Sequence, residues 1–482
     1  MRGVRPHAPM AEDFISEFSN ADLKDLRRTR RLGNVVAAMA KAPGLSISAA
    51  CGGSNETIAA YRLLNCEDVT PAALLAPHYQ AVVKRCAQHA CVVVSQDTTE
   101  FDYSHMKETE GLGPLNEEYR RGFFMHSLYV VSEDGLPLGV LSAEMIIRND
   151  ETFRTAAARK HLPIEEKESF RWVEGYRKTL KLARSMPECE VFSISDREGD
   201  IFEVFEAWQL AVEEGLPAEW IIRANQDRAL TGMLEDDPAK LFAALAEAPV
   251  LGDIEFKVRA KKGTKKVKGS TVQTSRKGRT VCQTIRAMKI TPRPPARKGK
   301  KMKEVSFWAI LADETHPPAG QDPIRWILLT SKEVTTLEEA RRILNLYLRR
   351  WDIEVFHRVL KTGCRVERIQ LKTVEALTCA LVIYAVIAWR ILYLTHLGRT
   401  CPDMPCSCVF EEEEWKAACA VVRRKNKKST GEPTLSEFIG IIGKLGGHLG
   451  RKSDGPPGPQ SIWQGMARVR DFALVWQVCH EE

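Results

Sequence analysis

Hydrophobic and polar positions along the chain predict three successive regions. Residues 10–90 carry apolar residues at helical spacing, as in Leu32, Val35 and Val36. From Cys91 onward, short apolar runs rich in β-branched residues alternate with helical segments, and helical spacing returns towards the C-terminus. We therefore expect a mixed α/β sheet with a helical region before it and another after it in the sequence.

Two of the predicted strands lead into acidic residues. The strand at residues 91–95 runs into Asp97, and the strand at 191–195 runs into Asp196. Ligands of open α/β sheets bind at the ends of strands, so both carboxylates are candidates for a site. The other predicted elements are two strands within 123–147 joined through Glu133, Asp134 and Gly135, strands at 219–223 and 326–330, and a helix at 201–210.

One predicted helix, at residues 336–363, carries a stripe of polar side chains. Thr336 and Glu339 form a capping box at its start, and Gly363 provides a stop. At about 100° per residue, five polar residues fall on one face of this helix. They are Tyr347, Arg350, Glu354, Arg358 and Lys361. This mixture suits a place where a metal ion and a nucleic-acid backbone meet, although an ordinary solvated face has the same spacing.

Asp97, Asp196 and Glu354 together form a candidate metal site. Three carboxylates can hold two Mg²⁺ ions about 3.5–4 Å apart, the arrangement used for phosphoryl transfer. The three acids are far apart in the chain, so only the fold can bring them together. An alternative reading of residues 196–200 is an ordinary strand-to-helix turn in which Asp200 caps the next helix.

Positive charge is concentrated in one segment. Residues 257–303 contain 18 Lys or Arg and no Asp or Glu, so the rest of the chain carries a net charge of −11 (7 − 18). Such a concentration is typical of a surface that binds a polyanion such as nucleic acid. A solubilising flexible loop is the alternative, because several Gly and Pro residues interrupt the segment. A second basic cluster comprises Arg27, Arg28, Arg30 and Arg31.

Composition narrows the class of protein. A hydrophobic content of 44% and a charged content of 28% in 482 residues describe a globular protein of several domains. The N-terminal sequence has no secretory signal, and Met1 or Met10 could be the start. The longest uncharged apolar run, at 376–389, is too short to span a membrane and predicts a buried helix. Thirteen cysteines indicate free thiols, and the four between Cys401 and Cys419 lack the paired spacing of common zinc sites.

Several ordered motifs together resemble bacterial insertion-sequence transposases of the DDE class, in the IS-four family. The spacing Tyr347-x2-Arg350-x3-Glu354-x6-Lys361 matches the family's Y-R-E-K signature. The other matching motifs begin at Asp25 (D-x-R-R-x-x-R-L), Ala60 (A-Y-R), Asp97 (D-T-T), Arg121 (R-G), His126 (H-S), Glu166 (E-K-E-S), Asp196 (D-R-E-G-D-I), Trp326 (W-I-L-L-T-S) and Trp351 (W-D-I-E-x-F-H). The resemblance covers nearly the whole chain.

The resemblance implies an RNase H-like catalytic core with a β-rich insertion, flanked by helical N- and C-terminal domains. The implied domains are DNA-binding at 1–90, catalytic at 91–371 with the basic insertion at 228–310, and dimerisation at 372–482. The implied activity is cut-and-paste transposition, in which metal-dependent phosphoryl transfer frees a 3′ end, passes through a hairpin intermediate and joins the 3′ ends to target DNA. The implied partners are double-stranded DNA and a second copy of the chain, with no membrane, in the bacterial cytoplasm or on its nucleoid.

The resemblance also assigns roles to individual residues. Asp97, Asp196 and Glu354 take the catalytic and metal-ligand roles, with two Mg²⁺ ions per site and Mn²⁺ as a substitute. Trp326 stacks on a flipped base. The residues expected to contact DNA are Arg27, Arg28, Arg31, Tyr61, Arg62, Trp326, Tyr347, Arg350, His357, Arg358 and Lys361.

The chain departs from the family pattern at three places. Arg358 stands where a close relative has lysine, Gly199 replaces a common alanine, and the details of the basic segment do not match. A DNA-binding relative without catalysis and a nuclease that cuts without joining are the alternatives.

Overall fold

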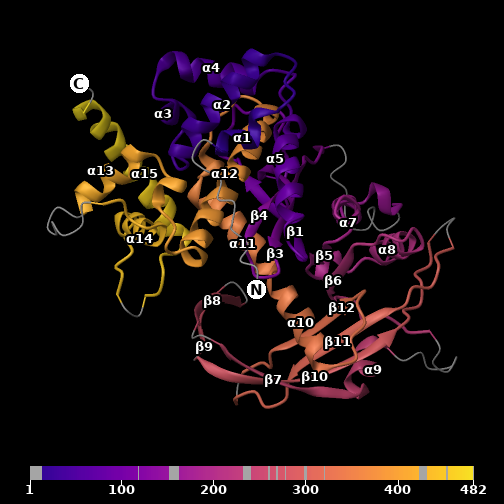
Figure 1. The fold of residues 1–482 in the computed structure, drawn as a ribbon. Helices are drawn as coiled ribbons and strands as arrows, with labels where there is room; N and C mark the ends of the chain where they lie inside the picture. Colours follow the sequence, from indigo (N-terminus) through magenta and orange to yellow (C-terminus); the bar gives the residue numbers. More distant parts are fainter. Residues whose placement is uncertain are drawn as a thin grey trace. The chain divides into compact units, whose positions relative to one another are not determined.

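The computed structural model describes residues 13–480, except 118, 151–161, 232–239, 259–260, 268–269, 277, 298–300, 320, 423–430 and 452–453. Two compact units divide the chain (Figure 1). The first unit combines Met1–Leu162 with Trp351–Glu482, and the second is Pro163–Arg350. Each unit is described by itself.

Helices form the start of the first unit, as the hydrophobic spacing predicts. They are α1 (Asp13–Ser19), α2 (Leu26–Lys41), α3 (Ile47–Cys51), α4 (Ser54–Leu64) and α5 (Pro71–Cys86). Side chains cap α2, α3 and α5 at their N-termini, because the oxygens of Asp25, Ser46 and Thr70 each accept a backbone N–H of the first turn. The apolar face of α2 is buried, which confirms the predicted helical spacing.

An antiparallel sheet follows in the same unit. It contains β1 (Cys91–Asp102), β2 (Gly113–Pro114), β3 (Arg121–Ser132) and β4 (Pro137–Ile146), with β3 between β1 and β4. The predicted pair of strands within 123–147 is confirmed, and Gly135 in the turn has a positive φ of 88°. The predicted end of the first strand is wrong. Strand β1 continues past Asp97 to Asp102, because its ladder with β3 extends beyond the apolar run into polar residues.

The long helix α12 (Val374–Thr400) is the core of the C-terminal part. It is apolar enough to span a membrane by length and composition, but 89% of its most apolar window is buried inside the fold. This confirms the predicted buried helix. Three more helices follow, α13 (Glu412–Val422), α14 (Leu435–Leu445) and α15 (Pro459–His480). The sequence also predicts a loop at 424–433, and residues 424–430 lie outside the described residues.

The second unit contains six hydrogen-bonded strands in the order β5-β6-β12-β11-β10-β7. Strands β5 (Glu190–Ser195) and β6 (Glu219–Arg223) are parallel, and β12 (Arg325–Thr330), β11 (Phe307–Glu314), β10 (Arg279–Ile290) and β7 (Val250–Val258) continue antiparallel (Figure 1). The helices are α7 (Phe170–Arg184), α8 (Phe202–Glu213), α9 (Leu241–Glu247) and α10 (Leu337–Leu348). Much of the basic segment is therefore strand, including the separate hairpin of β8 (Lys261–Val267) and β9 (Ser270–Arg276).

The prediction of a single helix at 336–363 is wrong, because the structure divides this segment. The capping box of Thr336 and Glu339 is present, but α10 ends at Leu348, and α11 (Arg350–Arg358) follows after one residue. The N–H of Arg349 bonds the carbonyl of Leu346, the tighter i−3 pattern of a helix end. A π-helical turn (Val359–Gly363) then closes the segment. The stripe of five polar residues is consequently divided among α10, α11 and the π-helical turn, which carries Lys361.

A buried ionic cluster joins α1 and α5 to the sheet of the first unit. Glu17 is 3% exposed and contacts both His78 and Arg85. The Nε2 atom of His78 accepts the N–H of Val140 at 3.0 Å, so its Nδ1–H donates to Glu17 and the imidazole is neutral. Burial acts to raise the pKa of Glu17, but its electrostatic interaction and hydrogen bond with His78, and then those with Arg85, outweigh burial and lower the pKa to about 2.

We expect this cluster to make stability fall in acid. Because the pKa of Glu17 is lowered on folding from 4.5 to about 2, its stabilisation is complete above about pH 5 and is lost as the pH falls through that interval. The measurement is the free energy of unfolding by urea between pH 6 and 3, in about half-unit steps. Glu17→Gln should be less stable at pH 6 and should show a shallower decline. Equal slopes for the two proteins would contradict the assignment, and Glu133→Gln, on the exposed turn of the same unit, is the control.

Candidate functional site

In the first unit, α11 lies against the face of the sheet to which Asp97 belongs. Asp97 pairs with Ser127 across the β1–β3 ladder, and cross-strand partners project from the same face. Ser127 contacts α11 through a 3.0 Å hydrogen bond between its Oγ and Nε2 of His357. Tyr129, two residues further along β3, stacks on Phe356 of α11 with ring centroids 4.7 Å apart. The sheet face of Asp97 is thus the face that α11 covers.

Glu354 is one turn before His357 on α11. Residues three apart lie on neighbouring positions of a helix surface, so Glu354 is close to the helix face that meets β3. Both Glu354 and Asp97 are partly exposed, and the Asp97 Oδ1 accepts the N–H of Thr98 at 2.8 Å. Two of the three predicted acids therefore project towards one region of the first unit.

His357 differs from its sequence-based role as a DNA contact. It is 7% exposed, and burial, with a smaller effect of Lys361, lowers its pKa to about 3. The imidazole is therefore neutral and bonded to Ser127, where it fixes α11 on β3. Arg358, the next residue, is exposed. Lys361 lies 5.1 Å from the ring centroid of Phe101 and 3.9 Å from Glu367.

In the second unit, Asp196 directly follows β5, as the sequence predicts. Its Oδ1 accepts the N–H of Glu198 at 2.8 Å and so caps the short 3₁₀ turn Arg197–Gly199. The cap fixes the direction of the carboxylate at the end of the strand. Asp196 is half-buried, whereas Arg197 and Glu198 are exposed.

Asp200 does not cap the next helix, so that reading of the 196–200 turn is wrong. Helix α8 has no side-chain cap, and Asp200 is 2% exposed. Its Oδ2 accepts the N–H groups of Asn225 and Gln226, and its Oδ1 pairs with Nη2 of Arg228 at 2.6 Å. All of these partners lie in the segment after β6, so Asp200 has a structural role: it holds that segment against the turn at 196–200.

Around Asp196 the second unit gathers cationic and aromatic side chains. Arg350 hydrogen-bonds Tyr347, whose pKa is raised to about 12 by burial although Arg350 and Arg223 oppose this. The Tyr347 phenol therefore stays neutral and can donate a hydrogen bond. Its ring meets that of Trp326 edge to face, with centroids 5.7 Å apart. The structure thus brings together four residues that the sequence selected.

Arg223 is a member of this group that sequence reasoning missed. Burial lowers its pKa, and the nearby guanidiniums of Arg197 and Arg350 lower it further, while Tyr347 and Asp196 oppose them. Three guanidinium groups around one carboxylate give the region a positive potential suited to phosphate. The available signal was its place as the last residue of β6, the parallel neighbour of β5, which ends directly before Asp196.

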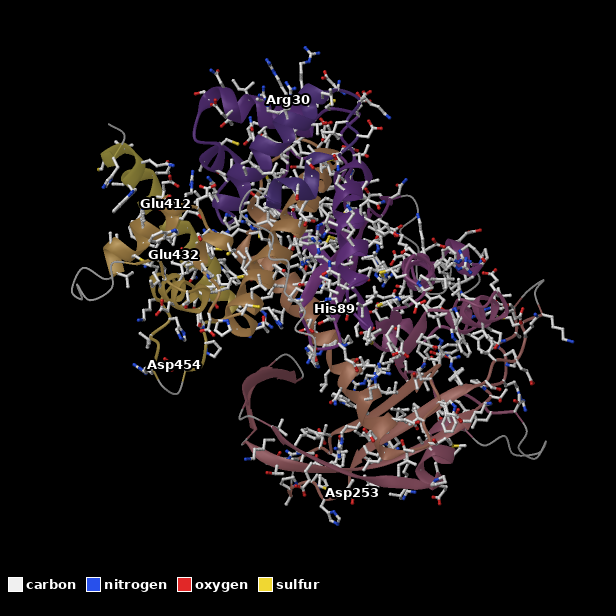
Figure 2. The ribbon with its side chains drawn as sticks, viewed as in Figure 1. Arg30, His89, Asp253, Glu412, Glu432 and Asp454 are labelled. Carbon is white, nitrogen blue, oxygen red and sulfur yellow. The ribbon has the colours of Figure 1, made fainter. Side chains whose placement is uncertain are left out.

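The N-terminal arginines form one surface with α4. Arg27, Arg28 and Arg31 of α2 line an open cavity of about 520 Å³ together with Arg62 of α4. Arg27 is paired with Asp25 and Arg28 with Asp68, and Arg31 is exposed. Arg30, labelled in Figure 2, lies at the outer surface of the same helical region. Tyr61 is next to Arg62 and lines an adjoining cavity.

The donor chemistry of the three predicted acids suits hard divalent cations. Asp97, Asp196 and Glu354 offer carboxylate oxygens on partly exposed side chains, the ligands that Mg²⁺ prefers. Asp97 and Glu354 belong to one unit and Asp196 to the other, so their assembly into one site stays a prediction. Among the described residues, no group of three or more His, Cys, Asp or Glu is placed to hold a metal ion, and this includes the C-terminal cysteines.

Three protein-family models match the chain in succession. The model described as transposase DNA-binding matches residues 10–69, and the model described as transposase DDE domain matches residues 213–390. The model described as Transposase Tn5 dimerisation domain matches residues 386–476. The first match includes the arginine surface of α2 and α4, and the second includes Trp326, Tyr347, Arg350 and Glu354.

Proposed function

This chain belongs to the Tn5-like DDE transposases, enzymes that cleave and join DNA strands with divalent metal ions, and we propose that it performs cut-and-paste transposition. In this proposal a 3′ hydroxyl freed at the end of the element attacks the opposite strand to form a hairpin. After the hairpin opens, the same hydroxyl attacks target DNA. The observation that best supports it is the group formed by Asp196, Arg223, Tyr347, Arg350 and Trp326, which combines an acid with phosphate donors and an aromatic ring.

We propose that Asp97, Asp196 and Glu354 together form the catalytic site. Two Mg²⁺ ions bound there, or Mn²⁺ in their place, would activate the attacking oxygen and stabilise the leaving oxygen. Neighbouring groups of the protein would hold the three carboxylates in place. The N–H groups of Thr98 and Glu198 orient Asp97 and Asp196. The contacts of His357 and Phe356 with β3 hold α11, the helix that carries Glu354.

Separate groups of residues would hold the DNA. Arg350, Lys361 and Arg358 would contact phosphates near the reacting strand, and Tyr347 would donate its phenolic hydrogen. His357 would act indirectly by positioning α11. Arg27, Arg28, Arg31, Tyr61 and Arg62 would engage the sequence at the end of the element, because they share one open surface on α2 and α4.

The proposed domains follow the order of the family matches. DNA binding is assigned to 1–90, catalysis to 91–371 with its β-rich insertion at 228–310, and dimerisation to 372–482. We propose that two copies hold the two ends of one element, and that the protein works on the nucleoid in the bacterial cytoplasm.

The test of this function uses purified protein and a duplex carrying the inverted repeat that borders the coding sequence. With Mg²⁺, hairpin ends and strand-transfer products on a supercoiled plasmid are expected. Nicks or double-strand breaks without hairpins or joining would instead favour a nuclease. Binding without any cleavage would favour a non-catalytic DNA-binding relative, and either result overturns the proposal.

Trp326→Ala should affect the hairpin step selectively. A base stacked on an aromatic ring contributes about 1–3 kcal/mol, so losing it should lower the rate of hairpin formation by roughly 5- to 150-fold while the first nick is unchanged. Single-turnover assays on a pre-nicked duplex measure the two steps separately. Trp308→Ala, a half-buried tryptophan on the neighbouring strand β11, is the control. Equal losses in nicking and hairpin formation would contradict the stacking role.

A further inference from the structure

A second basic groove adjoins the arginine surface of the first unit, and no predicted role uses most of its residues. It is an open cavity of about 820 Å³ between α4, the loop that follows β1 and the segment that precedes α12. Ile58 and Arg62 line both this groove and the arginine cavity, so the two form one continuous surface. We call it the α4 groove.

Charge in the α4 groove favours an anionic ligand. Its lining contains three permanent cations, Arg62, Lys107 and Lys372, against one carboxylate, Glu108. Lys107, Lys372 and Glu108 are exposed, and neither lysine forms an ion pair with an acidic residue that the structure describes. Two uncompensated ammonium groups on separate segments can each neutralise one phosphate.

The groove also has an apolar floor and rigid walls. Ile58, which is 49% exposed, Met106 and Leu371 supply apolar surface, and Tyr61 adds an aromatic ring. The two loops are joined, because the Thr109 hydroxyl donates to the Leu371 carbonyl at 2.8 Å and the Glu110 N–H donates to the Lys372 carbonyl at 2.8 Å. The lysines therefore stand on a fixed frame, which reduces the entropy lost on binding.

We propose that the α4 groove binds the sugar–phosphate backbone of duplex DNA that continues from the arginine surface. Lys107 and Lys372 contact phosphates, and the apolar floor faces the deoxyriboses. These contacts are independent of base sequence, because only phosphate and sugar are touched. The inference rests on the proposed transposase function and adds two contact residues and a path for the DNA on this unit.

The test measures the salt dependence of binding to a short duplex of random sequence by fluorescence anisotropy in NaCl. Each phosphate contact contributes about 0.9 to the slope of log K against log salt, so Lys107→Gln with Lys372→Gln should make the slope shallower by about 2. The matched control is Lys84→Gln with Lys444→Gln, which removes the same charge from exposed positions on α5 and α14 outside the groove. Glu108→Gln should tighten binding.

Two results would overturn the inference. One is an unchanged slope in the groove variant, and the other is an equal change in the control pair, which would indicate general charge alone. Failure of the transposase function is distinguished by the wild-type protein, which would then give no hairpin or strand-transfer products from the duplex carrying the element's ends. If the wild type binds and cuts normally and the groove variant has an unchanged slope, the DNA-binding role of the groove is ruled out and the proposed transposase function is retained.

Discussion

Asp97→Asn is expected to abolish DNA cleavage and strand transfer while leaving binding to the element's ends within a few-fold of wild type. The substitution keeps the shape of the side chain and removes the charge that a divalent ion requires. Losing several kcal/mol of transition-state stabilisation corresponds to a decrease in rate of at least about a thousandfold. The measurement is single-turnover cleavage of a labelled duplex with Mg²⁺, with end binding followed by gel shift.

The matched control for Asp97→Asn is Asp134→Asn. Asp134 is exposed in the turn between β3 and β4, so the same chemical change occurs in the same sheet away from the proposed site. It should leave the cleavage rate unchanged. Substantial cleavage by Asp97→Asn would show that this carboxylate is not a metal ligand. Glu354→Gln and Asp196→Asn should behave like Asp97→Asn if the three acids act as one site.

Asp200→Ala is expected to destabilise the protein by about 3–5 kcal/mol, the usual effect of removing one partner from a buried ion pair. The change leaves the guanidinium of Arg228, 9% exposed, without its carboxylate. It also removes the acceptor of the Asn225 and Gln226 N–H groups. The measurement is the free energy of unfolding in guanidinium chloride, followed by tryptophan fluorescence.

The control for Asp200→Ala is Asp322→Ala, an exposed aspartate of the same unit, which should change stability by less than about 0.5 kcal/mol. A loss below about 1 kcal/mol in Asp200→Ala would contradict the structural role, because a buried unpaired guanidinium is costly. Comparison with Asp196→Asn separates the two acids of the same motif. The first should lose stability, and the second should lose cleavage with stability retained.

Several elements follow from the sequence because local physics specifies them. The capping box of Thr336 and Glu339 and the strand that ends at Asp196 depend on neighbouring residues alone. The end of α10 could not be predicted, because a single tight turn at Arg349 ends the helix. The end of β1 could not be predicted, because its length depends on pairing with β3, a strand distant in sequence. Arg223 and the role of Asp200 were missed for the same reason.

The family, the order of the regions and the candidate acids could all be read from the linear chain, because spaced motifs and periodic hydrophobicity are properties of the sequence. Which side chains contact one another depends on the folded structure. In the fold, Asp97 pairs with Ser127, which contacts α11, and Arg223 and Tyr347 lie near Asp196. His357 and Asp200 are buried, and Arg62 lines two cavities. Burial and cross-strand register arise only when distant segments pack, and these determine charge state and direction.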